Sequence, residues 1–210
     1  MNTKWKKLYF PLFWEVAFII GTRLWSIYAL YLYFLFFLGI LVAYQDSFSM
    51  RAWLSLLRSG KKFWIPVFLT GAATYLAYQF KLKFPSLLPM VLDVGIIDIR
   101  TTGVVDMFLF AVTFMFMAPF AEELFLRAGL ISFADKKKMV ATTLLSLILN
   151  MLLYADGWVG MVSMALLFLP MTLCYVCTRN KYASLTVHLV YGLCYHMPDF
   201  LYAVARMSMR

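Results

Sequence analysis

Long apolar segments recur along this chain, and they constrain its fold more than any other feature of the sequence. The segment from Leu8 to Tyr44 is almost continuously apolar. Hydrophobic residues make up 64% of the sequence and charged residues 14%, whereas charged residues are about 25% of an ordinary globular domain. A soluble core of this size could not bury so much apolar surface, and a disordered chain would be more polar. Because the apolar segments are continuous rather than alternating, they predict an all-α polytopic transmembrane bundle and not a transmembrane barrel.

The lengths of the apolar segments predict about seven transmembrane helices. We expect them at residues 8–22, 25–44, 63–80, 104–123, 139–155, 159–177 and 183–205. Residues 8–44 are too many for one span and few for two, and we divide them at the Gly21-Thr22-Arg23 turn. Residues 45–62 mix basic and apolar side chains, which predicts a short interfacial amphipathic helix. The sequence contains no internal repeat, so residues 1–210 are predicted to form one integral membrane domain.

The net charge of +9 comes from lysines and arginines that gather in short connecting segments. These segments are the N-terminus and residues 45–62, 127–138 and 179–181, and a seven-span arrangement places all four on the same side of the bilayer. The positive-inside rule then predicts a cytoplasmic N-terminus. The charge is therefore a mark of topology, with the lipid bilayer as partner and no nucleic acid. The short chain and the lack of an organellar targeting segment favour a bacterial plasma membrane.

Ionisable side chains within apolar segments are costly, and they mark candidate functional residues. They are Glu15, Arg23, Asp106, Glu122, Glu123, Arg127, His188 and His196, and the amide of Asn150 joins them. Glu123 and Arg127 are four residues apart on a helix, so we expect them to pair. Glu122 is turned by about 100° from Glu123, so it is expected to face a cavity, where a partly desolvated carboxylate suits a general base. For Glu15 we favour a structural role, paired with Arg23 or with another helix. We expect His196 to lie at the membrane interface.

The segment Glu122-Glu123-Leu-Phe-Leu-Arg127-Ala-Gly-Leu130 resembles the first motif, E-E-x-x-x-R, of the CAAX protease and bacteriocin-processing family, also called the Abi family. Members of that family are small intramembrane endopeptidases with several helices around a polar cavity. The resemblance covers roughly residues 104–205. The family's second motif, F-x-x-x-H, aligns with Ser146-Leu-Ile-Leu-Asn150, and its third, H-x-x-x-N, aligns with His188-Leu-Val-Tyr-Gly192. Asparagine therefore replaces the second-motif histidine, and glycine replaces the last residue of the third motif.

The resemblance implies roles for the matching residues. In the family, the first glutamate and the second-motif histidine activate a water molecule, and the third-motif residues stabilise the oxyanion. This assigns Glu122, Glu123, Arg127, Asn150 and His188 to the catalytic site, with Glu122 as the base. Asn150 can orient a water molecule but cannot exchange its proton at neutral pH. Glu122 and His188 are also candidate ligands for a divalent metal such as zinc, although a catalytic zinc usually has three protein ligands.

The sequence is compatible with three alternative functions. The first is an intramembrane endopeptidase that cleaves membrane-associated peptides or proteins, with water entering from the cytoplasmic side, in a setting such as bacteriocin processing or self-immunity. The second is a non-catalytic relative that acts as a membrane adaptor or immunity protein, which Asn150 and Gly192 favour. The third is a small transporter, but no inverted repeat and no pair of broken helices supports it. The intact E-E-x-x-x-R motif favours the endopeptidase.

Overall fold

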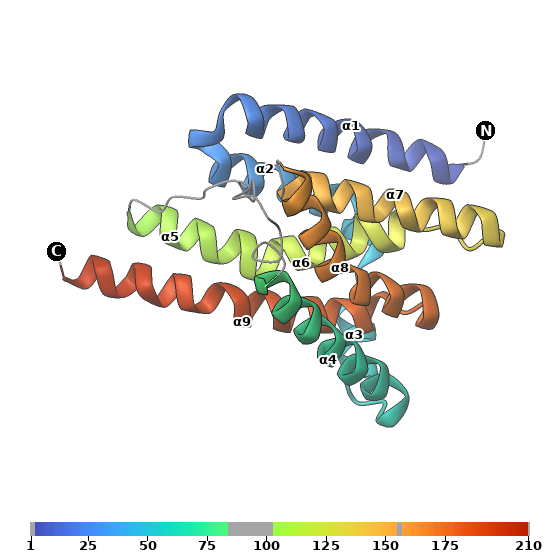
Figure 1. The fold of residues 1–210 in the computed structure, drawn as a ribbon. Coiled ribbons are helices and arrows are strands. Elements are labelled where there is room, and N and C mark those ends of the chain that lie inside the picture. Colours follow the sequence, from blue (N-terminus) through green and yellow to red (C-terminus); the bar gives the residue numbers. More distant parts are fainter. Residues whose placement is uncertain (1–2, 84–102, 155–156, 210) are drawn as a thin grey trace.

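The computed structural model describes residues 3–83, 103–154 and 157–209, and these ranges are helical almost throughout (Figure 1). The long helices are α1 (Thr3–Leu24), α2 (Ala29–Ala43), α4 (Lys61–Lys83), α7 (Lys136–Tyr154), α8 (Trp158–Thr178) and α9 (Lys181–Ser208). The segment before α7 divides into α5 (Val104–Phe110), η4 (Ala111–Met117), α6 (Ala118–Glu122) and η5 (Glu123–Gly129). Shorter elements are η1 (Ser26–Tyr28), η2 (Gln45–Ser47) and α3 (Met50–Leu57). Most of the predicted loop at 81–103 lies outside the described residues.

Residues 104–129 form one continuous helical segment in which two stretches, η4 and η5, are π-helical. Single π-helical turns often occur at functional sites because they shift the side chains that follow them. Pro119 lies directly after the π-helical stretch η4, inside this continuous segment, where a proline has no N–H to donate to the preceding turn. The acidic pair therefore follows directly on a local change of helix geometry, with Glu122 ending α6 and Glu123 beginning η5.

The amphipathic segment predicted at 45–62 forms α3 and the turn after it. The side chain of Ser49 accepts a hydrogen bond from the backbone N–H of Ala52, at 3.3 Å, and so caps the first turn of α3. Gly60 has a φ of +73°, a left-handed conformation that glycine adopts without a steric penalty, and it reverses the chain into α4. Residues 8–44 are divided into two helices as expected, since α1 ends at Leu24 and α2 begins at Ala29. The break lies at residues 25–28, however, and the segment Gly21-Thr22-Arg23, where the turn was expected, is still part of α1.

Four helical segments among the described residues are long and apolar enough to cross a membrane. They are Ser26–Ala43, Val104–Gly129, Lys136–Tyr154 and Trp158–Thr178. Helices α1, α4 and α9 have 22, 23 and 28 residues, a sufficient length, but they are less apolar. Large apolar side chains point outward, among them Ile27, Phe68 and Phe108. The chain is an all-α polytopic helical membrane protein, and the number of seven spans stays a prediction.

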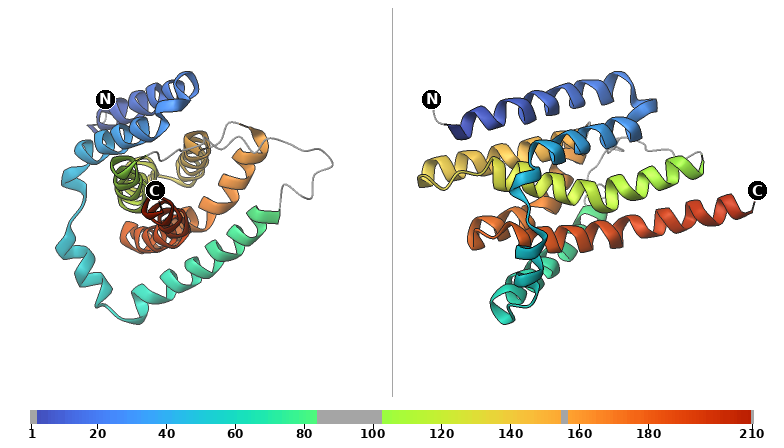
Figure 2. Two further views of the ribbon diagram at one scale, coloured as in Figure 1. Left: turned by 90° about the vertical axis from the view of Figure 1, so that its left-hand side faces the viewer. Right: turned by 180° about the vertical axis from the view of Figure 1, so that it is seen from behind.

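Helix packing places the protein core around α2 and the 104–129 segment, with α1 lying along the outside of α2 (Figure 2). Phe37 and Ile40 of α2 are completely buried there. Trp14 of α1 donates a hydrogen bond to the backbone carbonyl of Phe36, at 3.2 Å. A second core lies between α4, α8 and α9, where α4 runs obliquely across its neighbours (Figure 2).

Three of the four basic segments contact one another at the same end of the bundle. The ammonium of Lys181 donates to the carbonyl of Ser47, and the hydroxyl of Tyr182 accepts from the backbone N–H of Ser49 at 3.1 Å. The guanidinium of Arg179 lies 5.0 Å from the ring centroid of Phe133. The connections after α2, before α7 and after α8 are therefore neighbours, as the one-sided distribution of charge requires. Which side of the membrane this end faces stays a prediction.

Candidate active site

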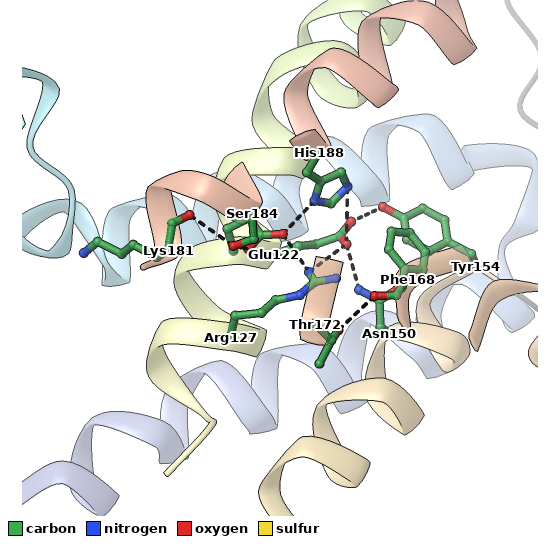
Figure 3. Close-up of polar contacts among 10 residues, drawn as sticks. Glu122, Arg127, Asn150, Tyr154, Phe168, Thr172, Lys181, Ser184 and His188 are labelled. Atoms are coloured by element: carbon green, nitrogen blue, oxygen red, sulfur yellow. Dashed lines mark hydrogen bonds and ion pairs between the residues drawn. The ribbon is translucent and has the colours of Figure 1, made fainter. Parts of the chain in front are cut away.

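Five residues predicted from the sequence meet in the interior, although they come from three separate parts of the chain (Figure 3). Glu122 and Glu123 lie at the junction of α6 and η5, and Arg127 lies one turn later. Asn150 comes from α7 and His188 from α9, and all five side chains are buried. Several packed helices are needed to remove so many polar groups from solvent, so the cluster is a feature of the folded bundle.

Glu122 occupies the centre of the cluster. Its Oε2 accepts a hydrogen bond from the Asn150 side-chain amide at 2.8 Å, and its Oε1 accepts one from the hydroxyl of Tyr154. The Nε2 atom of His188 lies 3.9 Å from Oε2. Glu122 is thus positioned by hydrogen bonds from α7 and faces a histidine of α9. The Oδ1 atom of Asn150 has no hydrogen-bond partner among the described residues.

Glu123 positions the ring of His188. The Nδ1 atom of His188 lies 3.1 Å from Oε1 of Glu123, and the hydroxyl of Ser184 donates to Oε2 at 2.5 Å. A hydrogen bond at Nδ1 fixes the orientation of an imidazole and leaves Nε2 to face the other side. His188 therefore connects the two carboxylates, with one ring nitrogen toward each.

Arg127 forms the expected pair with Glu123 and also lies against Glu122, so it is shared between the two carboxylates. Its Nη1 atom lies 3.5 Å from Oε1 of Glu123 and 3.6 Å from Oε2 of Glu122. The guanidinium also lies over the ring of Phe168, 5.6 Å from its centroid. One arginine between two buried carboxylates reduces the repulsion between them, which a pair with Glu123 alone would not do.

Sequence reasoning did not identify Tyr154 and Ser184, although the helical period could have found both. Tyr154 lies four residues after Asn150, and Ser184 lies four residues before His188. Residues four apart lie on the same face of a helix, so a polar side chain at that distance from a site residue is a candidate neighbour. In both cases the hydroxyl bonds one of the two carboxylates.

A cavity of about 390 Å³ adjoins this cluster. His188 and Tyr154 line its inner part, whereas Glu122 and Asn150 lie behind them and are not among its lining residues. From His188 the cavity continues along α9 to Asp199, which is exposed, and to Lys81 at the end of α4. These residues lie toward the end of the bundle opposite the basic segments, so the expected entry of water from the basic side is not the one that this cavity provides.

A second, larger hollow lies on the outer side of the same wall. This groove between α4 and α9 has a volume of about 690 Å³ and an almost entirely apolar lining. Tyr191 and Tyr195 line both the groove and the cavity. Their rings stack with centroids 5.4 Å apart, and they form the partition between an apolar surface and the polar interior.

Three polar residues outside the cluster were also singled out in the sequence. His196 lines the cavity together with His188, and its ring packs against Tyr195, Phe110 and Phe114. Its expected place at the membrane interface stays a prediction. The helix continues through Pro198 to Ser208. Glu15 is fully buried, and neither of its carboxyl oxygens has a hydrogen-bond partner among the described residues. Arg23 instead donates to the carbonyl of Leu152 at 2.8 Å.

Gly192, which stands at the last position of the third motif, is closely packed. A Cβ atom there would lie 3.3 Å from the carbonyl oxygen of Phe114 and 3.3 Å from Cγ of Pro119. Both neighbours are rigid, since one is backbone and the other is a proline ring. A side chain at this position would therefore have to push α9 and the 104–129 segment apart by a few tenths of an ångström.

The residues present do not fit a metal centre. No group of three or more His, Cys, Asp and Glu side chains that could hold a metal ion occurs in the described part of the chain. The cationic guanidinium of Arg127 also lies within 3.6 Å of both carboxylates, where it supplies the positive charge that a metal ion would bring. Glu122 and His188, the candidate zinc ligands in the sequence, therefore belong to a cluster of ion pairs and hydrogen bonds with Arg127 and Asn150.

Comparison with known protein families gives a match to one of them, described as type II CAAX prenyl endopeptidase Rce1-like, over residues 104–194. No match was found among curated proteins or among solved structures. The matched segment begins with α5 and ends within α9, so it contains Glu122, Glu123, Arg127, Asn150 and His188. Residues 104–194, the part of the chain that builds the buried cluster, are thus similar to the Rce1-like family of type II CAAX prenyl endopeptidases.

Proposed function

We propose that this protein is an intramembrane endopeptidase that hydrolyses peptide bonds of membrane-associated peptides or proteins, with Glu122 as the general base. The observation that carries the proposal is the meeting of Glu122, Asn150 and His188 from three helical segments beside a cavity. A buried carboxylate held by neutral hydrogen-bond donors and facing an imidazole is an arrangement suited to proton transfer. The family to which residues 104–194 are similar supports the same chemistry.

The proposed reaction uses a water molecule that enters the cavity and reaches Glu122 past His188. Glu122 takes a proton from the water molecule while the oxygen of that water attacks the peptide carbonyl carbon. Both ring nitrogens of His188 carry protons in the transition state, so that Nδ1 donates to Glu123 and Nε2 donates to the oxyanion. The carbon–nitrogen bond then breaks, and the proton held by Glu122 passes to the leaving amine. Arg127 lies within 3.6 Å of both carboxylates and places a positive charge beside them in the interior.

Two features indicate where a substrate would lie. The cavity reaches the cluster through His188 and Tyr154, and the apolar groove lies against the same tyrosine partition. A peptide in the cavity could therefore carry an apolar part in the groove, in contact with lipid. The setting that we propose is a bacterial plasma membrane, with bacteriocin precursors among the peptides to be tried as substrates.

The test is cleavage of quenched fluorogenic apolar peptides by the purified protein in neutral detergent. Glu122→Gln preserves the size of the side chain and removes the base, so kcat should fall by about 10²-fold or more. Glu15→Gln is the matched control, because Glu15 is an equally buried carboxylate outside the cluster, and it should cleave like the wild type. Cleavage by Glu122→Gln at the wild-type rate would rule out the proposed base.

A second candidate function is a non-catalytic family member that binds peptides without cleaving them. It is favoured by Asn150, whose amide cannot exchange a proton at neutral pH, and by Gly192, where the close packing disfavours the side-chain donor of the third motif. A wild-type protein that binds the peptides and cleaves none of them would support this candidate and contradict the endopeptidase.

A further inference from the structure

Lys81 is a buried cation at the end of the cavity remote from the catalytic cluster. Its side chain is 8% exposed, whereas Lys83, two residues later on the same helix, is exposed. A lysine at a helix end would ordinarily extend its ammonium into water. The fold instead keeps the ammonium of Lys81 inside the cavity, where it lies 3.8 Å from the Sδ atom of Met164.

The ammonium has no anionic partner in the described part of the chain. No carboxylate there lies within 4.0 Å of it, and its other neighbour is the ring of Tyr195, 5.4 Å from ammonium to centroid. A thioether and an aromatic face replace little of the hydration that a buried ammonium loses. Asp199 lines the same cavity but is exposed and forms no ion pair with Lys81. The cavity therefore presents to whatever enters it a positive charge that no carboxylate of the described residues neutralises.

Lys81 lies at a distance from the catalytic cluster that a short peptide can span. Tyr195, which the ammonium faces, lies seven residues after His188 on α9. At about 1.5 Å per residue this is about 10 Å along the helix axis. An extended peptide covers about 3.3–3.6 Å per residue, so a peptide bond held at His188 would place a group a few residues farther along the chain near Lys81.

We propose that Lys81 binds a carboxylate of the substrate peptide and so determines which peptides are positioned at the cluster. The carboxylate comes either from the free C-terminus of the peptide or from an acidic side chain a few residues beyond the bond that is cleaved. The proposal rests on the proposed function in taking the ligand to be a peptide. It adds a specificity-determining residue outside the segment that matches the family, which begins at residue 104.

The test measures binding rather than cleavage, so that its outcome is separate from that of the endopeptidase proposal. The protein carries Glu122→Gln, and the probes are fluorescein-labelled apolar tetrapeptides in neutral detergent, followed by fluorescence anisotropy. One probe has a free C-terminus, the second is amidated, and the third is amidated with aspartate as its last residue. An ion pair with a buried ammonium should make the free carboxylate bind about 10-fold or more tightly than the amide.

Variants of Lys81 assign the preference to this side chain. Lys81→Met should abolish the preference for the free carboxylate over the amide. The amidated probe should still bind to this variant, which also shows that the variant is folded. Lys81→Arg should keep part of the preference. Lys83→Met is the matched control and should bind all probes like the parent protein. Asp199→Asn should strengthen binding of the free carboxylate, because it removes a negative charge from the same cavity.

The aspartate probe identifies the source of the carboxylate. Binding like the free C-terminus shows that an acidic side chain suffices, and binding like the plain amide shows that Lys81 requires the chain end. Equal affinities of all three probes for the parent protein, or a preference that survives in Lys81→Met, would overturn the proposal. A preference that depends on Lys81 would stand even if no peptide were cleaved.

Discussion

At the scale of single residues, the charge of Arg127 is what allows two adjacent carboxylates to remain in the interior. Its guanidinium lies within 3.6 Å of both and is itself buried. None of its nitrogens makes a hydrogen bond within the described part of the chain, so the interaction is one of charge rather than of directed bonds. Removing one partner from a buried ion pair leaves the other charges uncompensated.

We therefore expect Arg127→Met to destabilise the protein by about 3–5 kcal/mol, because two buried carboxylates would lose their counter-charge. The measurement is the midpoint of thermal unfolding in neutral detergent, followed by circular dichroism. Arg58→Met is the control, since Arg58 is exposed beyond the end of α3, and it should shift the midpoint little. Equal midpoints for the two variants would show that the cluster does not need the arginine charge.

The two residues that depart from the family motifs differ in what the structure permits. Asn150→His places a proton-exchanging group beside Glu122, where Asn150 already donates a hydrogen bond. We expect this variant to raise any peptidase activity, within the roughly 10²–10⁴-fold that general acid–base catalysis contributes. Asn150→Ala serves as control and should lower it, because it removes a donor to Glu122. A rate for Asn150→His no higher than that of Asn150→Ala would contradict the proposed role of this position.

Gly192→Asn, by contrast, should not restore the third motif. Its Cβ would press on the carbonyl of Phe114 and on the ring of Pro119, and overpacking of this kind costs about 1–3 kcal/mol. We expect a lower unfolding midpoint and no gain in activity when this change is added to Asn150→His. A double variant that is both more stable and more active would show that α9 and the 104–129 segment can separate enough to accommodate a side chain at residue 192.

At the scale of elements, the contact between α4 and α9 separates the bilayer from the interior. The two helices line the apolar groove, and Tyr191 and Tyr195 of α9 face both the groove and the cavity. Tyr78 of α4 packs edge-on against both rings, with centroids 6.3 Å and 5.7 Å away. An apolar part of a substrate that lies in the groove would therefore be close to a peptide in the cavity.

Filling the groove should reduce the use of substrates that carry a long apolar part. Ala72 lines the groove, whereas its neighbour Ala73 is exposed and does not line it. Ala72→Phe should raise KM for a peptide with a long alkyl chain several-fold and should leave a short peptide without the chain unaffected, while Ala73→Phe should change neither. If Ala72→Phe and Ala73→Phe gave the same KM for the alkylated peptide, the groove would not be part of the substrate site.

At the scale of the whole molecule, the cavity and the basic segments lie toward opposite ends of the bundle. The basic connections contact one another beside the start of α9, whereas the cavity extends along α9 to Asp199. If the positive-inside rule holds for this chain, the cavity approaches the non-cytoplasmic surface. Peptides on that side of the membrane would then reach the cluster.

Cysteine labelling in intact cells tests this orientation. In a protein whose Cys174, Cys177 and Cys194 are replaced by serine, Ser26→Cys and Ser59→Cys place single exposed thiols in the α1–α2 turn and the α3–α4 turn. A membrane-impermeant maleimide should label Ser26→Cys in intact cells and should label Ser59→Cys only after the cells are opened. The reverse pattern would place the basic segments outside and the N-terminus out of the cytoplasm.

The sequence alone determined the helices and most members of the cluster, because hydrophobicity and helical spacing are local properties of the chain. The all-α membrane fold, the division of residues 8–44 into two helices, the amphipathic helix at α3 and the family similarity of residues 104–194 all followed from it. Only the tertiary structure decided how Arg127 is shared and that His196 lines the cavity with His188. It also decided that Lys81 is buried there and that Gly192 is closely packed against the 104–129 segment. These properties depend on which helix faces are brought into contact, and helical periodicity gives the faces of one helix but not the neighbour against which each face packs.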